Sequence, residues 1–296
     1  MCNSLDQPQE IQLETRQGRL AGLSWRAEDA PRVLCLHGWL DNAASFVPLA
    51  PLLNRLDLVA LDLPGHGHSE HRHSTTRYHF IDYLFNIDAA LDALGWADCH
   101  FLGHSMGAAI SAVYSAGAPE RVRSIVMLDT MGPVSVSAEG TASRLQRSMA
   151  RNRRGPRPAR RFDSIDEMVQ ARRSVSDLSE ASARLICDRA ARQAGSHFEW
   201  RSDPALNWVS SLVMADEQAM DLVKNIQAPA LTFTVTEDSP WSSRAKLEER
   251  RRAIAHGKHE TLEGHHHFHM DDPGQIADTV RDFIIDNDRS PSKRPS

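Results

Sequence analysis

Residues 99–109 read CHFLGHSMGAA, and this stretch decides the fold. A short apolar run over 99–102 is followed by Gly103-His104-Ser105-Met106-Gly107 and then by small residues typical of a helix packed close to a sheet. A G-x-S-x-G sequence between a strand and a helix indicates a nucleophile elbow, a sharp turn that lifts a serine above the sheet. Its two glycines let strand and helix approach, because no side chain stands between them. Ser105 is therefore the candidate nucleophile.

On both sides of this elbow, short apolar runs alternate with helical patterns. Runs of this kind suit strands buried on both faces of a parallel sheet. They cover residues 33–36, 56–63, 125–128, 230–235 and 259–262. An amphipathic helical pattern over 81–94 lies between two of the predicted strands. A predicted hairpin over 11–26 precedes the strands, and a predicted helix over 273–285 follows them. The alternation predicts an α/β fold with a mostly parallel sheet.

One long segment interrupts this alternation. Residues 133–225 read as helices alone, and the strand pattern resumes only after them. We therefore expect one α/β core, made of 11–132 and 226–286, with an inserted helical cap over 133–225. The polar tail 287–296 contains two prolines and is expected to be disordered.

The composition excludes several classes of protein. With 296 residues, 41% hydrophobic and 25% charged, the chain lies in the range of soluble globular proteins. A net charge of -5 gives no global field that would attract nucleic acid. No apolar run approaches the roughly 18 residues that cross a bilayer, and no secretion signal is evident. We expect a cytoplasmic protein without a membrane span, whose cysteines are reduced because none forms a CxxC pair.

A serine nucleophile needs a general base. Three adjacent histidines, His265, His266 and His267, follow the last predicted strand, where loops at the carboxyl ends of parallel strands converge. His266 is our first choice, before its two neighbours. A second cluster contains His66, His68, His71 and His73. Closely spaced loop histidines without matched cysteines or an H-x-x-x-H helix seldom form a metal site, so we expect no metal.

The base in turn needs a carboxylate, which lies between the serine and the histidine in the chain order of this kind of site. Asp238, after the strand that ends at Val235, is our first choice. Asp129, at the end of the strand over 125–128, and Glu237 are the alternatives.

An oxyanion hole completes the requirement, because acyl transfer places negative charge on the carbonyl oxygen. The backbone amide of Met106, directly after the nucleophile, would be one donor. The amide of Trp39, in the loop after the strand over 33–36, would be the second. His37 in the same loop is interpreted as structural.

Together these residues resemble the α/β-hydrolase superfamily, in its capped serine-hydrolase-like branch. The likeness is carried by residues 36–46 (LHGWLDNAASF), 62–69 (DLPGHGHS), the elbow, 228–231 (APAL) and 264–267 (GHHH). The resemblance implies an eight-stranded sheet, a Ser-His-acid triad, no cofactor and a lid inserted after the sixth strand. By that pattern Ser105, His266 and Asp238 carry the triad roles.

The predicted function is hydrolysis of a small to medium carboxylic ester, a small-molecule substrate. A thioesterase, a lactonase, a carbon–carbon bond hydrolase or a perhydrolase would use the same triad, and a non-catalytic ligand-binding member of the fold is a further alternative. Phe198, Trp200 and Trp208 are candidates for an apolar wall of the pocket, unless they pack inside the cap. The arginine-rich run over 151–161 is interpreted as a solvated loop of the cap rather than a nucleic-acid site.

Overall fold

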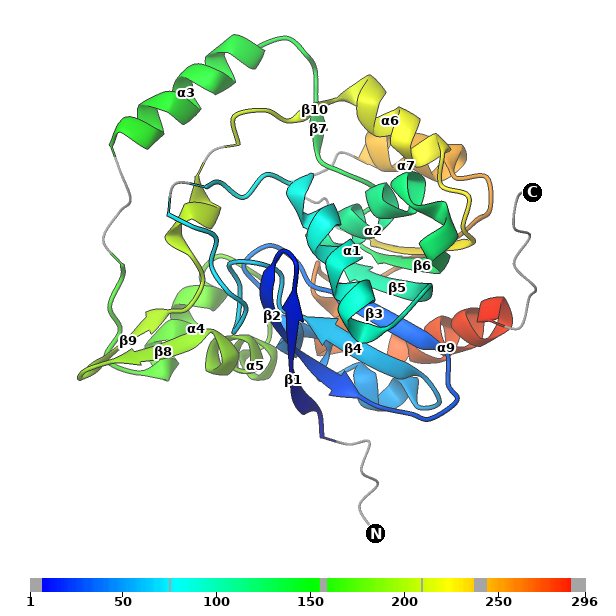
Figure 1. Ribbon diagram of the computed structural model, residues 1–296, viewed down its shortest axis with the longest axis horizontal. Coiled ribbons are helices and arrows are strands. Elements are labelled where there is room, and N and C mark those ends of the chain that lie inside the picture. The colour runs from blue at the N-terminus through cyan, green and yellow to red at the C-terminus, as the bar shows by residue number, and fades with distance from the viewer. Residues whose placement is uncertain (1–6, 75, 155–158, 209, 237–243, 289–296) are drawn as a thin grey trace.

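The computed structural model describes residues 7–74, 76–154, 159–208, 210–236 and 244–288. At its centre is an eight-stranded sheet in the order β1-β2-β4-β3-β5-β6-β11-β12 (Figure 1). These strands are β1 (Gln9–Thr15), β2 (Gly18–Trp25), β3 (Arg32–Leu36), β4 (Asp57–Leu61), β5 (Cys99–His104), β6 (Val122–Leu128), β11 (Ala230–Val235) and β12 (Gly257–Leu262). β1 and β2 pair antiparallel, as do β2 and β4, and every pair from β4 to β12 is parallel. This is the mostly parallel eight-stranded sheet that the sequence predicts.

Helices cover both faces of the sheet because its inner strands β3, β4, β5, β6 and β11 are buried along almost their whole length. The core helices are α1 (Asp82–Leu94), α2 (Met106–Gly117), α6 (Asp216–Lys224), α7 (Arg244–Ala253) and α9 (Gly274–Asp288), with the short α8 (Phe268–Asp271) and the 3-10 helix η3 (Pro119–Arg121) beside them. One apolar cluster joins the sheet to α1 and α2 through residues such as Ile87 and Ile110. The other joins it to α9 and to the 3-10 helices η1 (Ala43–Phe46) and η2 (Ala50–Leu53) through Phe46 and Val280.

The segment between β6 and β11 differs from the prediction of helices alone. It contains α3 (Thr141–Arg153), α4 (Ile165–Arg173) and α5 (Glu180–Ala190), but also an antiparallel hairpin, β8 (Ala191–Ala194) with β9 (His197–Trp200). The two-residue strands β7 (Ser135–Val136) and β10 (Met214–Ala215) pair in parallel, and a 3-10 turn, η4 (Pro204–Asn207), lies between β9 and β10. The hairpin strands are only four residues long and carry no buried side chain, so they lack the alternation that marks a strand in sequence.

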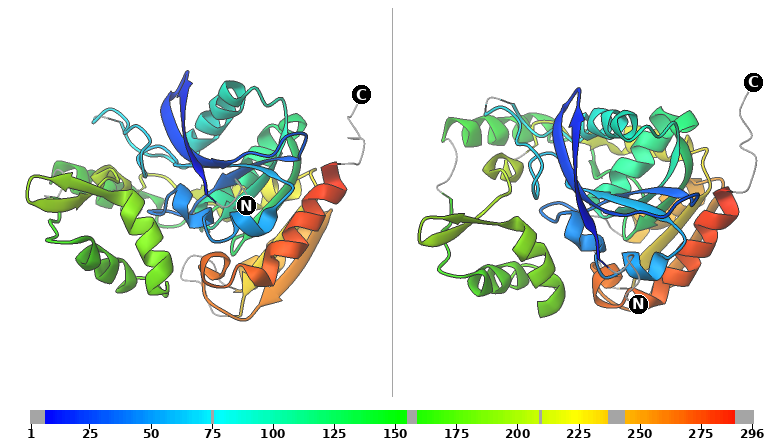
Figure 2. Two further views of the ribbon diagram at one scale, coloured as in Figure 1. Left: turned by 90° about the horizontal axis from the view of Figure 1, so that it is seen from below. Right: turned by 60° about the horizontal axis from the view of Figure 1, so that its bottom comes forward.

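Two parts of this segment pack in different places. α4, α5 and the hairpin lie to one side of the sheet (Figures 1 and 2) and pack around a third apolar cluster. It includes Phe162, Met168 and Ile186, together with Met270 of α8. α6, by contrast, packs beside α2 and α7, and its Val223 belongs to the core cluster. We therefore propose that the cap ends before α6 rather than at residue 225.

A buried ion pair joins α5 to the sheet core. Arg189, near the end of α5, donates to Asp62 through Nε at 3.0 Å from each carboxylate oxygen, and it also lies 2.5 Å from Glu10 Oε1 in β1. The side chains of Arg189 and Asp62 are 6% and 0% exposed. A charged pair removed from water in this way is costly to break, because the remaining partner stays buried.

We expect Arg189→Met to lower the free energy of unfolding by about 3–5 kcal/mol, since it leaves the Asp62 carboxylate buried with only backbone amides as donors. Chemical denaturation measures this change. The matched control is Arg192→Met, which removes an arginine paired with Glu199 at the surface and should cost less than about 1 kcal/mol. Equal losses in the two variants would contradict the anchoring role of Arg189.

The C-terminal boundary differs slightly from the prediction. Asn287 and Asp288, placed in the disordered tail by the sequence, form the end of α9, and residues 289–296 lie outside the described part of the chain. Within the described part, no helix combines the length and apolar character needed to cross a membrane.

Candidate active site

The elbow forms as the sequence predicts, and its serine is conformationally strained. Ser105, between β5 and α2, has a φ of 51° and a ψ of -115°, and its amide donates to Leu128 O at 2.9 Å. A Cβ on Gly103 would lie 2.5 Å from Ala108 N, and one on Gly107 would lie 1.9 Å from Leu36 O. Only glycine allows α2 to lie this close to β3 and β5, and a strained residue held in such a turn is typical of a functional site.

A second strained turn, at the end of β6, presents a carboxylate to His266. Asp129 has a φ of 56° and is buried. Its Oδ1 accepts from the amide of Val235 at 3.3 Å, and its Oδ2 lies 2.5 Å from His266 Nδ1. Because the carboxylate accepts a hydrogen bond from Nδ1–H, the Nε2 atom of a neutral His266 keeps its lone pair and can act as a base.

This contact changes the order of preference among the acids. Our first choice, Asp238, lies outside the described residues, as does Glu237. The carboxylate that the structure brings to His266 is the alternative, Asp129. The physical reason is the turn after β6: its positive φ directs the side chain toward the loop that follows β12 (Gly257–Leu262) rather than into solvent.

The elbow also holds the loop that carries His266. His104, directly before the nucleophile, donates through Nε2 to the carbonyl oxygen of His266 at 2.9 Å, and the two rings have centroids 4.7 Å apart. Among the described residues, no hydrogen bond joins Ser105 to His266. In hydrolytic enzymes, a hydrogen bond between nucleophile and base often forms only when substrate is bound.

The predicted oxyanion loop follows β3. Leu40 has a φ of 61°, and the amide of Asp41 donates to Gly38 O, so the loop forms a tight turn beside Ser105. Trp39 is 40% exposed at the tip of this turn, and Met106 opens α2, where a helix leaves amides without intrahelical partners. His37 is structural, as predicted, because its ring bonds Gly38 O through Nδ1 and accepts from Leu63 N through Nε2.

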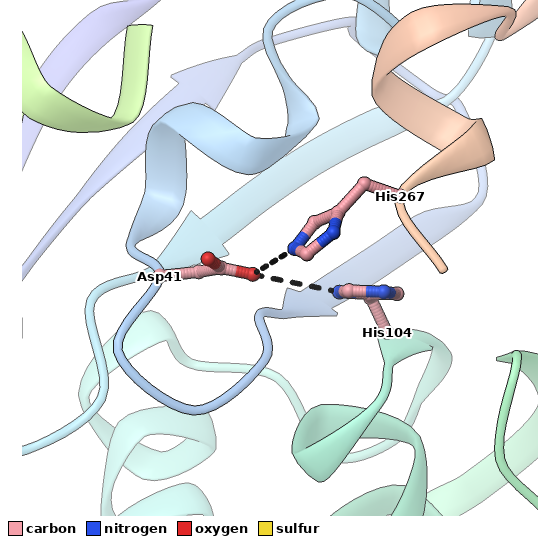
Figure 3. Close-up of side chains that lie close together, drawn as sticks. All are labelled: Asp41, His104 and His267. Carbon is pink, nitrogen blue, oxygen red and sulfur yellow. Dashed lines mark hydrogen bonds and ion pairs between the residues drawn. The ribbon is translucent and has the colours of Figure 1, made fainter. Parts of the chain in front are cut away.

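A buried polar cluster behind the elbow was not found by sequence reasoning. Asp41 Oδ1 lies 2.5 Å from Arg172 Nη2 of α4, and its Oδ2 accepts from His267 Nε2 at 3.2 Å (Figure 3). Burial alone raises the pKa of Asp41, but Arg172 and His267 outweigh it and hold that pKa well below its usual range. Burial lowers the pKa of His104 to about 3. The sequence signals were Asp41 in the loop stretch LHGWLDN, to which we assigned no role, His104 in the elbow, and His267, which we considered only as an alternative base.

Comparison with known proteins agrees with this geometry. Residues 31–273 match the family described as the alpha/beta hydrolase fold. The chain belongs to this family. It is 28% identical to a serine hydrolase-like protein of Danio rerio, over 93% of this chain and 88% of that protein. It is also 26% identical to serine hydrolase-like protein 2 of Homo sapiens, over 93% of each.

Solved structures place the chain in the same fold. A hypothetical protein from Pseudomonas aeruginosa has a TM-score of 0.86 at 30% identity, covering 93% of this chain and 99% of that one. The thioesterase domain from the curacin biosynthetic pathway has a TM-score of 0.81 at 22% identity, over 94% and 99% of the two chains. At that identity the second likeness shows the fold alone.

The cap aromatics of this hydrolase do not all match the expectation of a pocket wall. Phe198 and Trp200 pack against the third apolar cluster, where the Phe162 and Trp200 rings meet edge to face with centroids 5.4 Å apart. Trp208 lies under the guanidinium of Arg77 at 4.6 Å. Core packing, the simpler interpretation, therefore holds for Phe198 and Trp200.

Several histidines of the hydrolase are buried within the core, away from the contact between His266 and Asp129. His66, from the cluster of His66, His68, His71 and His73, is fully buried against His37, and burial lowers its pKa to about 3. His100 in β5 contacts Ser124 Oγ at 2.7 Å, and burial lowers its pKa to about 4. In the unfolded chain both rings would titrate at about 6.5.

We expect acid to destabilise the hydrolase from about pH 6.5 downward. In this range His66 and His100 bind protons in the unfolded chain but stay neutral in the folded one, because burial lowers their pKa values. The free energy of unfolding therefore falls as the pH falls, until the pKa values of the folded state are reached. At about pH 5, each of the two histidines should lower the free energy of unfolding by about 2 kcal/mol relative to neutral pH. His100→Gln should flatten the dependence of Tm on pH, whereas His256→Gln, at an exposed position, should leave it unchanged.

Proposed function

We propose that this hydrolase cleaves small to medium carboxylic esters through a covalent acyl-enzyme formed on Ser105. The observation that carries the proposal is the contact between Asp129 and His266, in a loop tied to the residue before Ser105. Ser105, Asp129 and His266 follow β5, β6 and β12, whose carboxyl ends lie at one edge of the sheet, and Asp129 contacts His266 there. A fold that only binds a ligand has no need of this arrangement.

In the proposed mechanism each residue has one task. Ser105 Oγ attacks the ester carbonyl while His266 Nε2 takes the serine proton, and His266 later returns this proton to the leaving alcohol. Asp129 holds the His266 ring in the required tautomer and stabilises the imidazolium that forms. A water molecule, activated in the same way by His266, then releases the acid and restores Ser105.

The developing oxyanion would be held by two backbone amides, those of Trp39 and Met106. The Met106 amide lies at the N-terminus of α2, where the helix dipole favours negative charge. Donors fixed in place before the reaction lose no energy to reorganisation when the charge appears, which makes this contribution large.

The same residues would also suit a thioester, and one structural neighbour is a thioesterase domain. Ester and thioester differ in leaving group, not in the acyl chemistry that the triad supplies, so the choice between them depends on the pocket. A lactone, or a substrate cleaved at a carbon–carbon bond, would be hydrolysed by the same residues.

The test is labelling with a fluorophosphonate followed by peptide mapping, together with turnover of p-nitrophenyl esters and acyl thioesters of increasing chain length. We expect a single adduct on Ser105 and faster turnover of short and medium esters than of thioesters. Faster thioester turnover would make the protein a thioesterase. Tight binding of apolar esters with no labelling of Ser105 would make it a binding protein instead.

A further inference from the structure

Beside the proposed triad, three atoms of metal-ligand type converge. Asp41 Oδ2, His104 Nδ1 and His267 Nε2 all lie within 4.8 Å of one another, and Figure 3 shows both rings directed at the carboxylate. Asp41 Oδ2 is 3.6 Å from the His104 nitrogen and 3.2 Å from the His267 nitrogen. The three side chains are 1%, 0% and 8% exposed. They come from the loop after β3, the end of β5 and the residue before α8.

One of these atoms has no partner that satisfies it. The His104 ring donates through Nε2 to the His266 carbonyl, so a neutral His104 turns the lone pair of Nδ1 toward Asp41. Among the described residues, this buried nitrogen has no hydrogen-bond partner. At 3.6 Å, an imidazole lone pair and a carboxylate oxygen repel each other. A cation between them would satisfy both atoms.

We propose that Asp41, His104 and His267 form a binding site for a divalent transition-metal ion such as Zn²⁺, and that the bound ion inhibits the hydrolase. Two imidazole nitrogens and one carboxylate oxygen are a typical zinc ligand set. With metal–ligand bonds of about 2.1 Å, tetrahedral ligand atoms lie about 3.4 Å apart. Asp41 Oδ2 already lies at about this spacing from the two nitrogens, at 3.6 Å and 3.2 Å. His267 would bind through Nε2, with its ring proton moving to Nδ1.

The surroundings keep the site open but weaken it. A Cβ on Gly38 would lie 2.9 Å from Asp41 Oδ2 and 3.1 Å from His104 Nδ1, so glycine leaves room there. Arg172 occupies the other carboxylate oxygen of Asp41 and brings a positive charge close to the ion. We therefore expect dissociation constants in the micromolar range rather than the much tighter binding of a structural zinc site.

We expect inhibition because the bound ion would place positive charge beside His266, and this expectation rests on the proposed function. The His266 ring centroid is 4.7 Å from that of His104 and 5.2 Å from that of His267. His266 becomes a cation in the proposed transition state, and a divalent ion at this range opposes that charge. The ion should therefore lower kcat more than it changes KM.

The binding test is independent of activity because it uses Ser105→Ala protein freed of metal by a chelator. Calorimetric titration with Zn²⁺ should give one ion per chain, and Co²⁺ should give the visible absorption bands of a low-coordinate nitrogen site. Adding His267→Asn should weaken binding at least about tenfold. The matched control is His265→Asn, an exposed histidine two residues away, which should keep the affinity. Equal affinity in both variants would overturn the proposal.

A measurement on the unaltered chain covers the case in which His267→Asn does not fold. Crystals soaked in Zn²⁺ should show an anomalous peak between Asp41, His104 and His267, whereas peaks only at exposed histidines such as His71 would refute the site. In active protein, micromolar Zn²⁺ should inhibit ester turnover and EDTA should restore it. Zinc bound at this site without any ester turnover would leave the metal site standing and contradict the proposed function instead.

Discussion

Asp129→Asn should lower kcat by about 10⁴-fold while leaving KM nearly unchanged. Asparagine preserves the shape of the side chain, but its amide can turn an NH₂ toward His266 and so favour the wrong tautomer of the ring. It also removes the charge that stabilises the imidazolium. Because Asp129 is buried behind His266, the loss should fall on the transition state rather than on substrate binding. Steady-state kinetics on a p-nitrophenyl ester measures both constants.

The control for this prediction is Asp238→Asn, which alters the carboxylate that the sequence favoured. We expect its kcat to equal that of the unaltered enzyme. The opposite result, a large loss with Asp238→Asn and none with Asp129→Asn, would return the acid role to Asp238. Thermal denaturation of both variants separates a catalytic loss from unfolding.

Ser105→Ala should abolish ester turnover, with a fall in kcat of at least about 10⁴-fold and complete loss of fluorophosphonate labelling. No acyl-enzyme can form without the hydroxyl, and only binding and the oxyanion donors remain to accelerate attack by water. The variant should still bind ester substrates, because the substitution removes only the hydroxyl oxygen.

Ser111→Ala is the matched control on the same helix. Its hydroxyl donates to Gly107 O at 2.8 Å, one turn beyond the elbow, and its loss should not affect kcat. Turnover that survives Ser105→Ala at more than a residual level would exclude the proposed mechanism, wherever the hydrolysis then takes place.

Most of the fold follows from local patterns that any reader of the chain can find. The apolar runs predict the parallel strands, and GHSMG between a strand and small residues predicts the elbow, because each feature depends on neighbours in sequence. His266 could also be proposed from the sequence, because the carboxyl ends of parallel strands meet at one edge of the sheet. The cap hairpin was missed because β8 (Ala191–Ala194) and β9 (His197–Trp200) are short and bury no side chain.

The acid partner of His266 was decided by the tertiary structure. β6 and β11 are adjacent in the sheet, so Asp129 and Asp238 follow strands that end at the same edge, and sequence spacing cannot separate them. The choice depends on the backbone after β6, where a positive φ at Asp129 directs its carboxylate to His266. The cluster of Asp41, His104 and His267 has the same origin. Its members lie far apart in the chain and meet only when three loops pack together, which no local pattern can encode.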